Sequence, residues 1–112
     1  MKQILGIIPI FLIFSPFALS QSQTIEIHAH RFAFSPSEIT LKPGETVQLH
    51  LVSDDVPHSL VVHGLHINQE ISKGHPADIT VTPASAGDFP GECGRFCGSG
   101  HGSMRFMIHV KE

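Results

Sequence analysis

The two cysteines of the 112-residue chain, Cys93 and Cys97, lie four positions apart, and His101 and Met104 follow at intervals of four and three residues. Thiolate, imidazole and thioether groups are soft or borderline donors, which select copper over magnesium, calcium or manganese. Ligands at this spacing converge on one centre in a loop, whereas on a strand they point to alternate faces. The segment from Glu92 to Met104 therefore predicts a copper-binding loop.

The number of copper ions in that loop is open on this evidence. Cys97, His101 and Met104 supply most of a mononuclear blue-copper site, and His58 is the natural candidate for the second imidazole. Cys93 is one thiolate too many for such a site. In an exported protein, a disulfide between Cys93 and Cys97 is a further alternative. Four glycines are expected to permit the tight path of the loop through positive φ angles: Gly94, Gly98, Gly100 and Gly102.

The first twenty residues are expected to be a secretory signal peptide cleaved after Ser20. Lys2 forms a short positive region, an apolar run extends from Ile4 to Phe14, and Ala18 and Ser20 are the small residues that a cleavage site needs. An uncleaved N-terminal anchor is the alternative, but the run is shorter than the ~20 residues of a membrane span. We therefore expect residues 21–112 to form one domain in the periplasm.

The charge of residues 21–112 argues against a nucleic-acid partner. Lys2 is the only charged residue before Gln21, so this part contains six basic and ten acidic residues and has a formal net charge of −4. Nucleic-acid binding calls for a basic face. Nine histidines are many for a chain of this size and favour metal handling.

The domain reads as strands separated by turns. Alternating apolar residues predict strands near residues 24–29, 39–41, 47–51, 59–62, 79–82 and 105–111. The apolar parity slips between Ile27 and Phe32, which predicts a bulge or bend near His30 and Arg31. Residues 63–75 show weak periodicity and are expected to be a long connection. Turn signals recur about every 8 to 12 residues, which indicates a single all-β domain, an antiparallel sandwich or a Greek-key barrel.

Two segments of the chain together resemble a known copper domain. The pattern C-x3-C-x3-H-x2-M from Cys93 to Met104 stands about 35 residues beyond S-x-D-V-x-H-S at residues 53–59. Both are similar to the binuclear CuA domain of cytochrome c oxidase subunit II and nitrous oxide reductase. The similarity extends to F-x-F-x-P at residues 32–36, P-G-x-x-V at 43–47, Ile67-Asn68, and F-x-G-x-C at 89–93. It implies a cupredoxin-like Greek-key β-sandwich.

The resemblance also implies a ligand set for two copper ions. Cys93 and Cys97 would bridge the ions through their sulfurs, and His58 and His101 would each bind one ion. Met104 and the backbone carbonyl of Arg95 would be weak ligands. The family usually has Glu or Gln at the Arg95 position, and in the oxidase that Glu also serves a metal at the contact with the catalytic subunit, which Arg cannot do.

These features favour a free-standing exported electron carrier. The oxidase subunit has two transmembrane helices before this domain and a surface Trp for electron entry, whereas this chain has a short apolar run and no Trp. We expect single-electron transfer with a periplasmic redox protein, such as a c-type cytochrome or a terminal reductase or oxidase. The alternatives are copper delivery between a donor and an acceptor, and a mononuclear blue-copper carrier. A saturated copper centre leaves no open position for a substrate, so an enzyme is not expected.

The remaining histidines and the Asp54-Asp55 pair are not expected to belong to the main copper site. We expect seven histidines to face solvent: His28, His30, His50, His63, His66, His75 and His109. Three of them, His63, His66 and His75, are the candidates for a second, weaker copper site. Asp54 and Asp55 are expected to solvate a loop.

Overall fold

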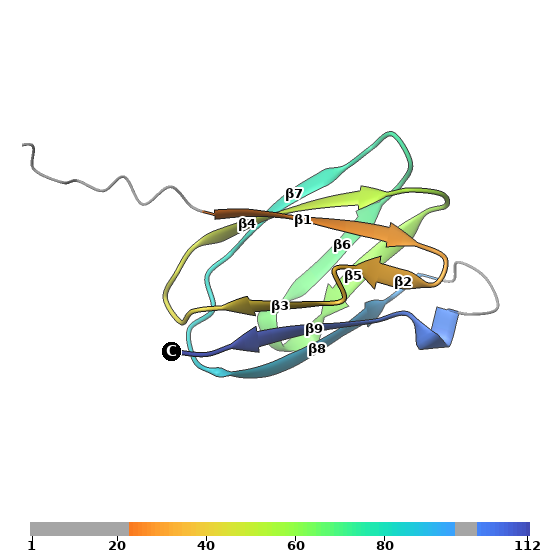
Figure 1. Ribbon diagram of the computed structural model, residues 1–112. Helices are drawn as coiled ribbons and strands as arrows, with labels where there is room; N and C mark the ends of the chain where they lie inside the picture. Colours follow the sequence, from red (N-terminus) through yellow and green to blue (C-terminus); the bar gives the residue numbers. More distant parts are fainter. Residues whose placement is uncertain (1–22, 96–100) are drawn as a thin grey trace, which may run out of the picture.

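Two facing β-sheets make up the domain in the computed structural model, which describes residues 23–95 and 101–112 (Figure 1). The first sheet has the order β2-β1-β4-β7 and consists of β1 (Gln23–His30), β2 (Ala33–Ser35), β4 (Val47–Ser53) and β7 (Ala77–Val81). The second has the order β3-β9-β8-β5-β6 and consists of β3 (Glu38–Leu41), β5 (His58–Val62), β6 (Ile67–Ile71), β8 (Gly87–Cys93) and β9 (Arg105–Val110). Two short 3-10 turns, η1 (His63–Leu65) and η2 (His101–Ser103), complete the described elements. The predicted all-β sandwich is confirmed.

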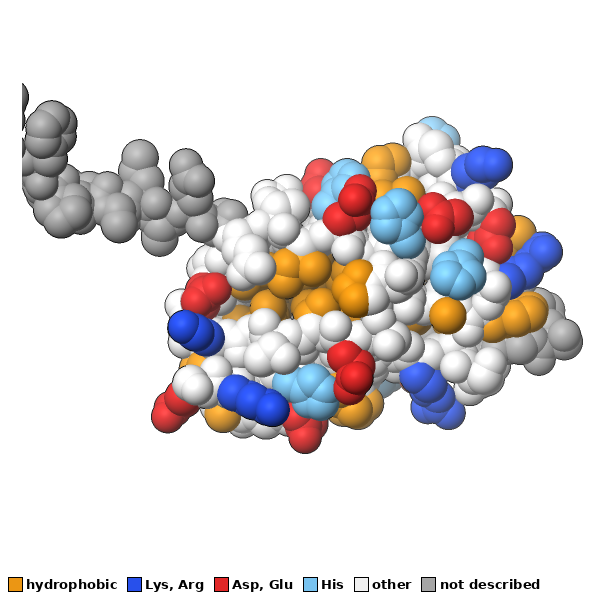
Figure 2. All heavy atoms as spheres, viewed as in Figure 1, with side chains coloured by type: hydrophobic (Ala, Val, Ile, Leu, Met, Phe, Trp, Pro, Cys, Tyr) orange, Lys and Arg blue, Asp and Glu red, His pale blue; other side chains and the backbone are white. Residues whose placement is uncertain are grey.

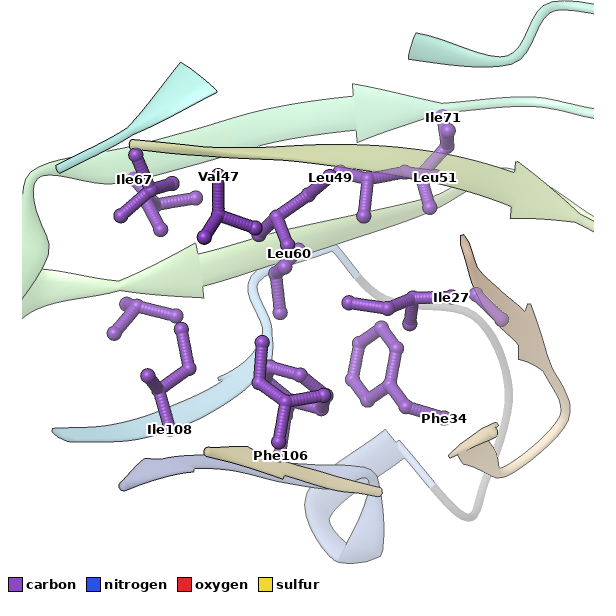
Figure 3. Packing of buried hydrophobic residues seen from close by; sticks show 14 of the residues in the cluster. Ile27, Phe34, Val47, Leu49, Leu51, Leu60, Ile67, Ile71, Phe106 and Ile108 are labelled. Carbon is purple, nitrogen blue, oxygen red and sulfur yellow. The ribbon is translucent and has the colours of Figure 1, made fainter. Parts of the chain in front are cut away.

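The core lies between the sheets and follows the alternation in the sequence. Along β4, Val47, Leu49 and Leu51 are buried and the residues between them are half-buried. All five residues of β5 are buried, as expected for a strand in the interior of a sheet. Phe34 and Phe106 close the core from opposite sheets, with ring centroids 5.7 Å apart in an edge-to-face arrangement (Figure 3). Such a pair adds a specific contact to the burial of apolar area.

Two pairs of strands depart from the antiparallel pairing expected for the sandwich. β1 runs parallel to β4, and β3 runs parallel to β9. Between β1 and β4 the chain crosses to the second sheet, where it forms β3, and β4 then returns beside β1 in the same direction. Apolar alternation specifies which face of a strand is buried, but it carries no information on the direction of the neighbouring strand.

Two local predictions also need correction. The slip near His30 is a complete reversal of the chain, because β2 pairs antiparallel with β1 and Ala33 lies opposite His30. The segment at residues 63–75 is not a plain connection but contains β6, which pairs antiparallel with β5. β6 buries only Ile67 and Ile71 at its two ends. An edge strand with so few apolar residues has almost no periodicity to detect.

One histidine joins three strands of the second sheet. The ring of His109 on β9 contacts Asp88 Oδ1 of β8 through Nδ1 at 2.7 Å and Glu38 Oε1 of β3 through Nε2 at 2.9 Å. Both contacts require a ring that donates from both nitrogens, which only the imidazolium form does. The Glu38 carboxylate, followed by that of Asp88, accordingly raises the pKa of His109 above its ordinary value.

We predict that His109→Asn makes the stability of the domain less dependent on pH. Because the pKa of His109 is raised on folding, its contribution is complete below about pH 6.5 and is lost as the pH rises through the folded-state pKa. Wild type should exceed the variant in free energy of unfolding near pH 6, and the difference should shrink by about pH 9. Denaturant unfolding across this pH range measures the difference, and His75→Asn, at an exposed position, is the control. A difference that is constant with pH would contradict the assignment.

Candidate metal centre

Three of the predicted ligands come together where β8 ends, at a part of the molecule that we call the cysteine end. His58 is the first residue of β5, Cys93 is the last residue of β8, and Met104 directly precedes β9. β8 pairs with both β5 and β9, and the amide of Cys93 donates a hydrogen bond to the carbonyl of Met104 at 3.2 Å. The exposed fractions of His58, Cys93 and Met104 are 0%, 2% and 0%. The three residues are therefore closed off from bulk water.

The donor atoms of His58, Cys93 and Arg95 face one another. His58 Nδ1 lies 3.9 Å from Cys93 Sγ, and the thiol of Cys93 lies 3.1 Å from the backbone carbonyl of Arg95. This unites one imidazole, one sulfur and one carbonyl of the predicted ligand set. Cys97 lies outside the described residues, and so does the side chain of His101, whose backbone begins η2. Within residues 23–95 and 101–112, no group of three or more His, Cys, Asp or Glu side chains is placed to share a metal ion.

Asp55 supports the candidate ligand His58, a role that the sequence analysis missed. Its carboxylate accepts hydrogen bonds from the amide of Arg31 at 2.8 Å, the amide of Val56 at 2.6 Å and Nε2 of His58 at 2.8 Å. Partial burial acts to raise its pKa, but the bonds from Arg31, His58 and Val56 together outweigh burial and lower the pKa to about 2. The expectation of loop solvation is therefore wrong for Asp55. The D-x-x-H spacing to His58 is the signal that points to this role.

The bond to Asp55 determines which nitrogen of His58 is available to a metal. An ionised carboxylate only accepts hydrogen bonds, so Nε2 of His58 carries the proton that is donated to Asp55. In the neutral ring the other nitrogen, Nδ1, then has a free lone pair, and this is the atom that faces Cys93. A carboxylate behind a histidine is a common way to orient a metal ligand. The residues present thus fit a soft metal ion such as copper.

Gly94 packs β8 closely against β5, which is a different role from the predicted one. Neither Gly94 nor Gly102 has a positive φ angle, and Gly98 and Gly100 lie outside the described residues. The amide of Gly94 donates to Ser59 Oγ at 2.9 Å. A Cβ atom at Gly94 would lie 2.5 Å from Val61 Cγ2 and 3.1 Å from Ser59 Oγ. Gly94 is therefore needed for close approach at the residue next to Cys93.

We predict that Gly94→Ala destabilises the domain by about 1–3 kcal/mol, as overpacking of a tight contact usually does. It should also weaken copper binding, because Cys93 must shift with its neighbour. Gly102→Ala is the matched control, since a Cβ atom there meets nothing within 4 Å. Thermal unfolding and copper titration of both variants measure the effect. Equal stability of the two variants would contradict the close-packing role.

The second copper site considered for His63, His66 and His75 is not formed. In the β5–β6 pairing, Val62 lies opposite Ile67 and His58 lies opposite Ile71. His63 and His66 therefore lie at one end of this hairpin, and His75 follows its other end. The two ends are about four residues apart, or roughly 13 Å.

A comparison with known protein families gives the context for this site. Residues 3–104 match the cupredoxin-like domain family. The chain belongs to this family. Cytochrome c oxidase subunit 2 of Thermus thermophilus is 32% identical to this cupredoxin over 89 residues, which cover 80% of the chain and 66% of that protein. The chain spans about two-thirds or less of the length of the curated relatives that it matches.

Solved structures share the fold. The periplasmic domain of subunit II of cytochrome oxidase from Bradyrhizobium japonicum superposes with a TM-score of 0.74 at 16% identity, covering 80% of this chain and 84% of that one. Auracyanin A, a blue copper protein from Chloroflexus aurantiacus, superposes with a TM-score of 0.62 at 16% identity, covering 79% and 98%. The resemblance to the CuA domain of oxidase subunit II is thus confirmed. None of the helices in the described ranges is long and apolar enough to cross a membrane.

Proposed function

We propose that this cupredoxin is an exported one-electron carrier with a binuclear copper centre of the CuA type. The observation that carries the proposal is the buried contact of His58 Nδ1 with Cys93 Sγ, 3.9 Å apart. His58 and Cys93 come from the two sequence segments that resemble the CuA domain. The proposal includes a signal peptide at residues 1–20, a mature domain at residues 21–112 and a periplasmic location.

The proposed ligand set joins the described donors to two residues of the loop. His58, Cys93, Met104 and the carbonyl of Arg95 are supported by their positions at the cysteine end, and Cys97 and His101 by their spacing in the sequence. The two cysteine sulfurs and the two imidazoles would be the main ligands of the copper ions, and the thioether and the carbonyl would be weak ligands. When bound, copper supplies a couple that gains and loses one electron.

The protein contributes a dry and rigid environment for that couple. Burial of His58, Cys93 and Met104 excludes water from the donor atoms, and strand pairing of β5, β8 and β9 fixes their backbones. Asp55 holds the His58 ring through Nε2 and so prevents it from rotating. Donors that do not move between oxidation states suit electron transfer. A site filled by protein donors does not suit substrate turnover, and we therefore propose no catalytic activity.

The proposed partner is a periplasmic redox protein. The support is the similarity to subunit 2 of cytochrome c oxidase. A c-type cytochrome and a terminal reductase or oxidase are the partner classes that this similarity favours. The relative is longer than this chain, so its assembly into a complex is not carried over.

The proposal predicts a copper-loaded protein that cycles reversibly by one electron and keeps its metal. Spectroelectrochemistry of the loaded mature chain should show full recovery of the visible bands after reduction and reoxidation. Incubation with a Cu(I) chelator should leave most of the copper bound after an hour, because His58, Cys93 and Met104 are buried. Rapid loss of copper to the chelator together with poor electron exchange would instead identify a copper-delivery protein.

A further inference from the structure

The basic residues of this acidic domain gather at the cysteine end. Four of the six Lys and Arg residues in the described ranges lie there: Arg31, Lys73, Arg95 and Arg105. Arg31 lies in the β1–β2 turn and Lys73 in the tight turn after β6. Arg95 comes shortly after the end of β8, and Arg105 begins β9. The other two, Lys42 and Lys111, lie at the opposite end, where the amide of Lys111 bonds the carbonyl of Leu41.

Most acidic groups at the cysteine end are already engaged by their neighbours. Asp55 accepts three hydrogen bonds, Asp54 pairs with His28 at 2.8 Å, and Glu70 pairs with Arg95 at 3.2 Å. The carboxylate of Glu92 lies 3.8 Å from Nε2 of His63. Residues 96–100 contain no charged side chain. The formal charge of this end is thus zero.

The remainder of the described domain is strongly negative. It contains Lys42 and Lys111 together with six acidic residues: Glu26, Glu38, Glu45, Asp78, Asp88 and Glu112. Its formal charge, with histidines counted as neutral, is −4. On the face seen in Figure 2, Lys and Arg side chains lie toward the two ends, whereas His and acidic side chains also cover the middle. The molecule therefore has an electric dipole whose positive side is the cysteine end.

Three side chains make this end available to an acidic surface. Arg31, Lys73 and Arg105 are exposed, and none forms an ion pair within the described residues. Beside them, Pro57, Glu70, Ser72, His75 and Arg95 line an open pocket of about 430 Å³. Oriented charges steer association and reject partners of the wrong sign. A basic partner would be drawn to the negative sides of the sandwich, away from the buried donors.

We propose that the cysteine end docks a redox protein whose contact surface is acidic. This inference rests on the proposed electron-transfer function, because only then does the end that holds the donors need to meet a partner. Arg31, Lys73 and Arg105 provide the attraction, and Arg95 provides less because Glu70 already neutralises it.

A pair of charge-reversal variants with the same net charge tests the proposal. Arg31→Glu with Lys73→Glu places the change at the cysteine end, and Lys42→Glu with Lys111→Glu places it at the opposite end. The two ends are separated by roughly 20 Å, the length of β8, or about two Debye lengths at 0.1 M salt. Only the charges at the cysteine end should therefore affect electron exchange at the copper centre.

The measurement is the rate constant for oxidation of the copper-loaded, reduced chain by one-electron oxidants of opposite charge, hexacyanoferrate(III) and tris(phenanthroline)cobalt(III). In each case one electron leaves the protein and reduces the oxidant. We expect the first pair of substitutions to slow the anionic oxidant by about fivefold or more at 0.1 M salt and to accelerate the cationic one. The second pair should change either rate less than about twofold. An acidic c-type cytochrome should respond to the substitutions as the anionic oxidant does, and a basic c-type cytochrome should respond as the cationic oxidant does.

The outcomes distinguish this inference from the function on which it rests. Equal responses to the two pairs of substitutions, or faster exchange with the basic cytochrome than with the acidic one, would overturn the docking proposal alone. A copper-loaded chain that exchanges electrons with none of these oxidants would overturn the proposed function and the docking proposal with it.

Discussion

Cys93→Ser should convert the centre from two copper ions to one. Serine has nearly the same shape as cysteine but replaces a soft thiolate by a hard hydroxyl, which is a poor ligand for Cu(I). Cys93 is 2% exposed and its sulfur faces both His58 Nδ1 and the carbonyl of Arg95. Loss of this sulfur removes the contact between the segment that contains His58 and the segment that contains the cysteines. Metal analysis and the visible spectrum of the reconstituted variant measure the result.

Cys97→Ser is the companion variant that separates the three interpretations of the cysteines. In a binuclear centre, both variants lose one of two ions. In a mononuclear blue-copper site, Cys97→Ser abolishes the site and Cys93→Ser leaves the single ion in place. In a structural disulfide, either variant lowers stability by about 2–4 kcal/mol without a change in copper content. Retention of full copper content by Cys93→Ser would therefore contradict the binuclear proposal.

Asp55→Asn should weaken both the fold and the copper site. One carboxylate oxygen accepts from Val56 and His58, and the other accepts from Arg31. An amide in either orientation turns an NH2 group toward one of these donors. We expect a loss of about 2–3 kcal/mol in the free energy of unfolding. Copper affinity should fall by about 10- to 100-fold, because His58 loses the group that orients it.

Asp54→Asn is the matched control for this effect. Asp54 is adjacent in sequence, and its exposed carboxylate pairs with the partly exposed His28 at 2.8 Å. An exposed pair of this kind contributes at most about 1 kcal/mol, and Asp54 makes no contact with His58. Denaturant unfolding of the apo variants and competitive copper titration measure both quantities. If Asp54→Asn and Asp55→Asn lowered copper affinity equally, the orienting role of Asp55 would be wrong.

The predictable parts of the fold are those where burial leaves a pattern in the chain. Alternation located β4 and β9, and the apolar residues that produce it, such as Leu49, Phe106 and Ile108, are buried in the structure. It did not locate β6, because an edge strand needs few apolar residues. It also did not specify that β1 runs parallel to β4, because strand direction depends on how the intervening chain crosses between the sheets.

The candidate site was predictable where its chemistry requires particular residue types. The segments around His58 and Cys93, 35 residues apart, were joined in the sequence analysis, and the structure places them in contact. The role of Asp55 depends on a turn that directs two amides and one imidazole at a single carboxylate. The role of Gly94 depends on the proximity of Val61 across a strand pair. Such roles follow from tertiary contacts, and residue type alone does not reveal them.

The most direct test of the binuclear proposal is the copper content and the electron paramagnetic resonance spectrum of the reconstituted mature protein. The proposal predicts two copper ions per chain and a hyperfine pattern from one unpaired electron shared equally by two copper nuclei. One copper ion per chain with hyperfine splitting from a single nucleus would contradict it.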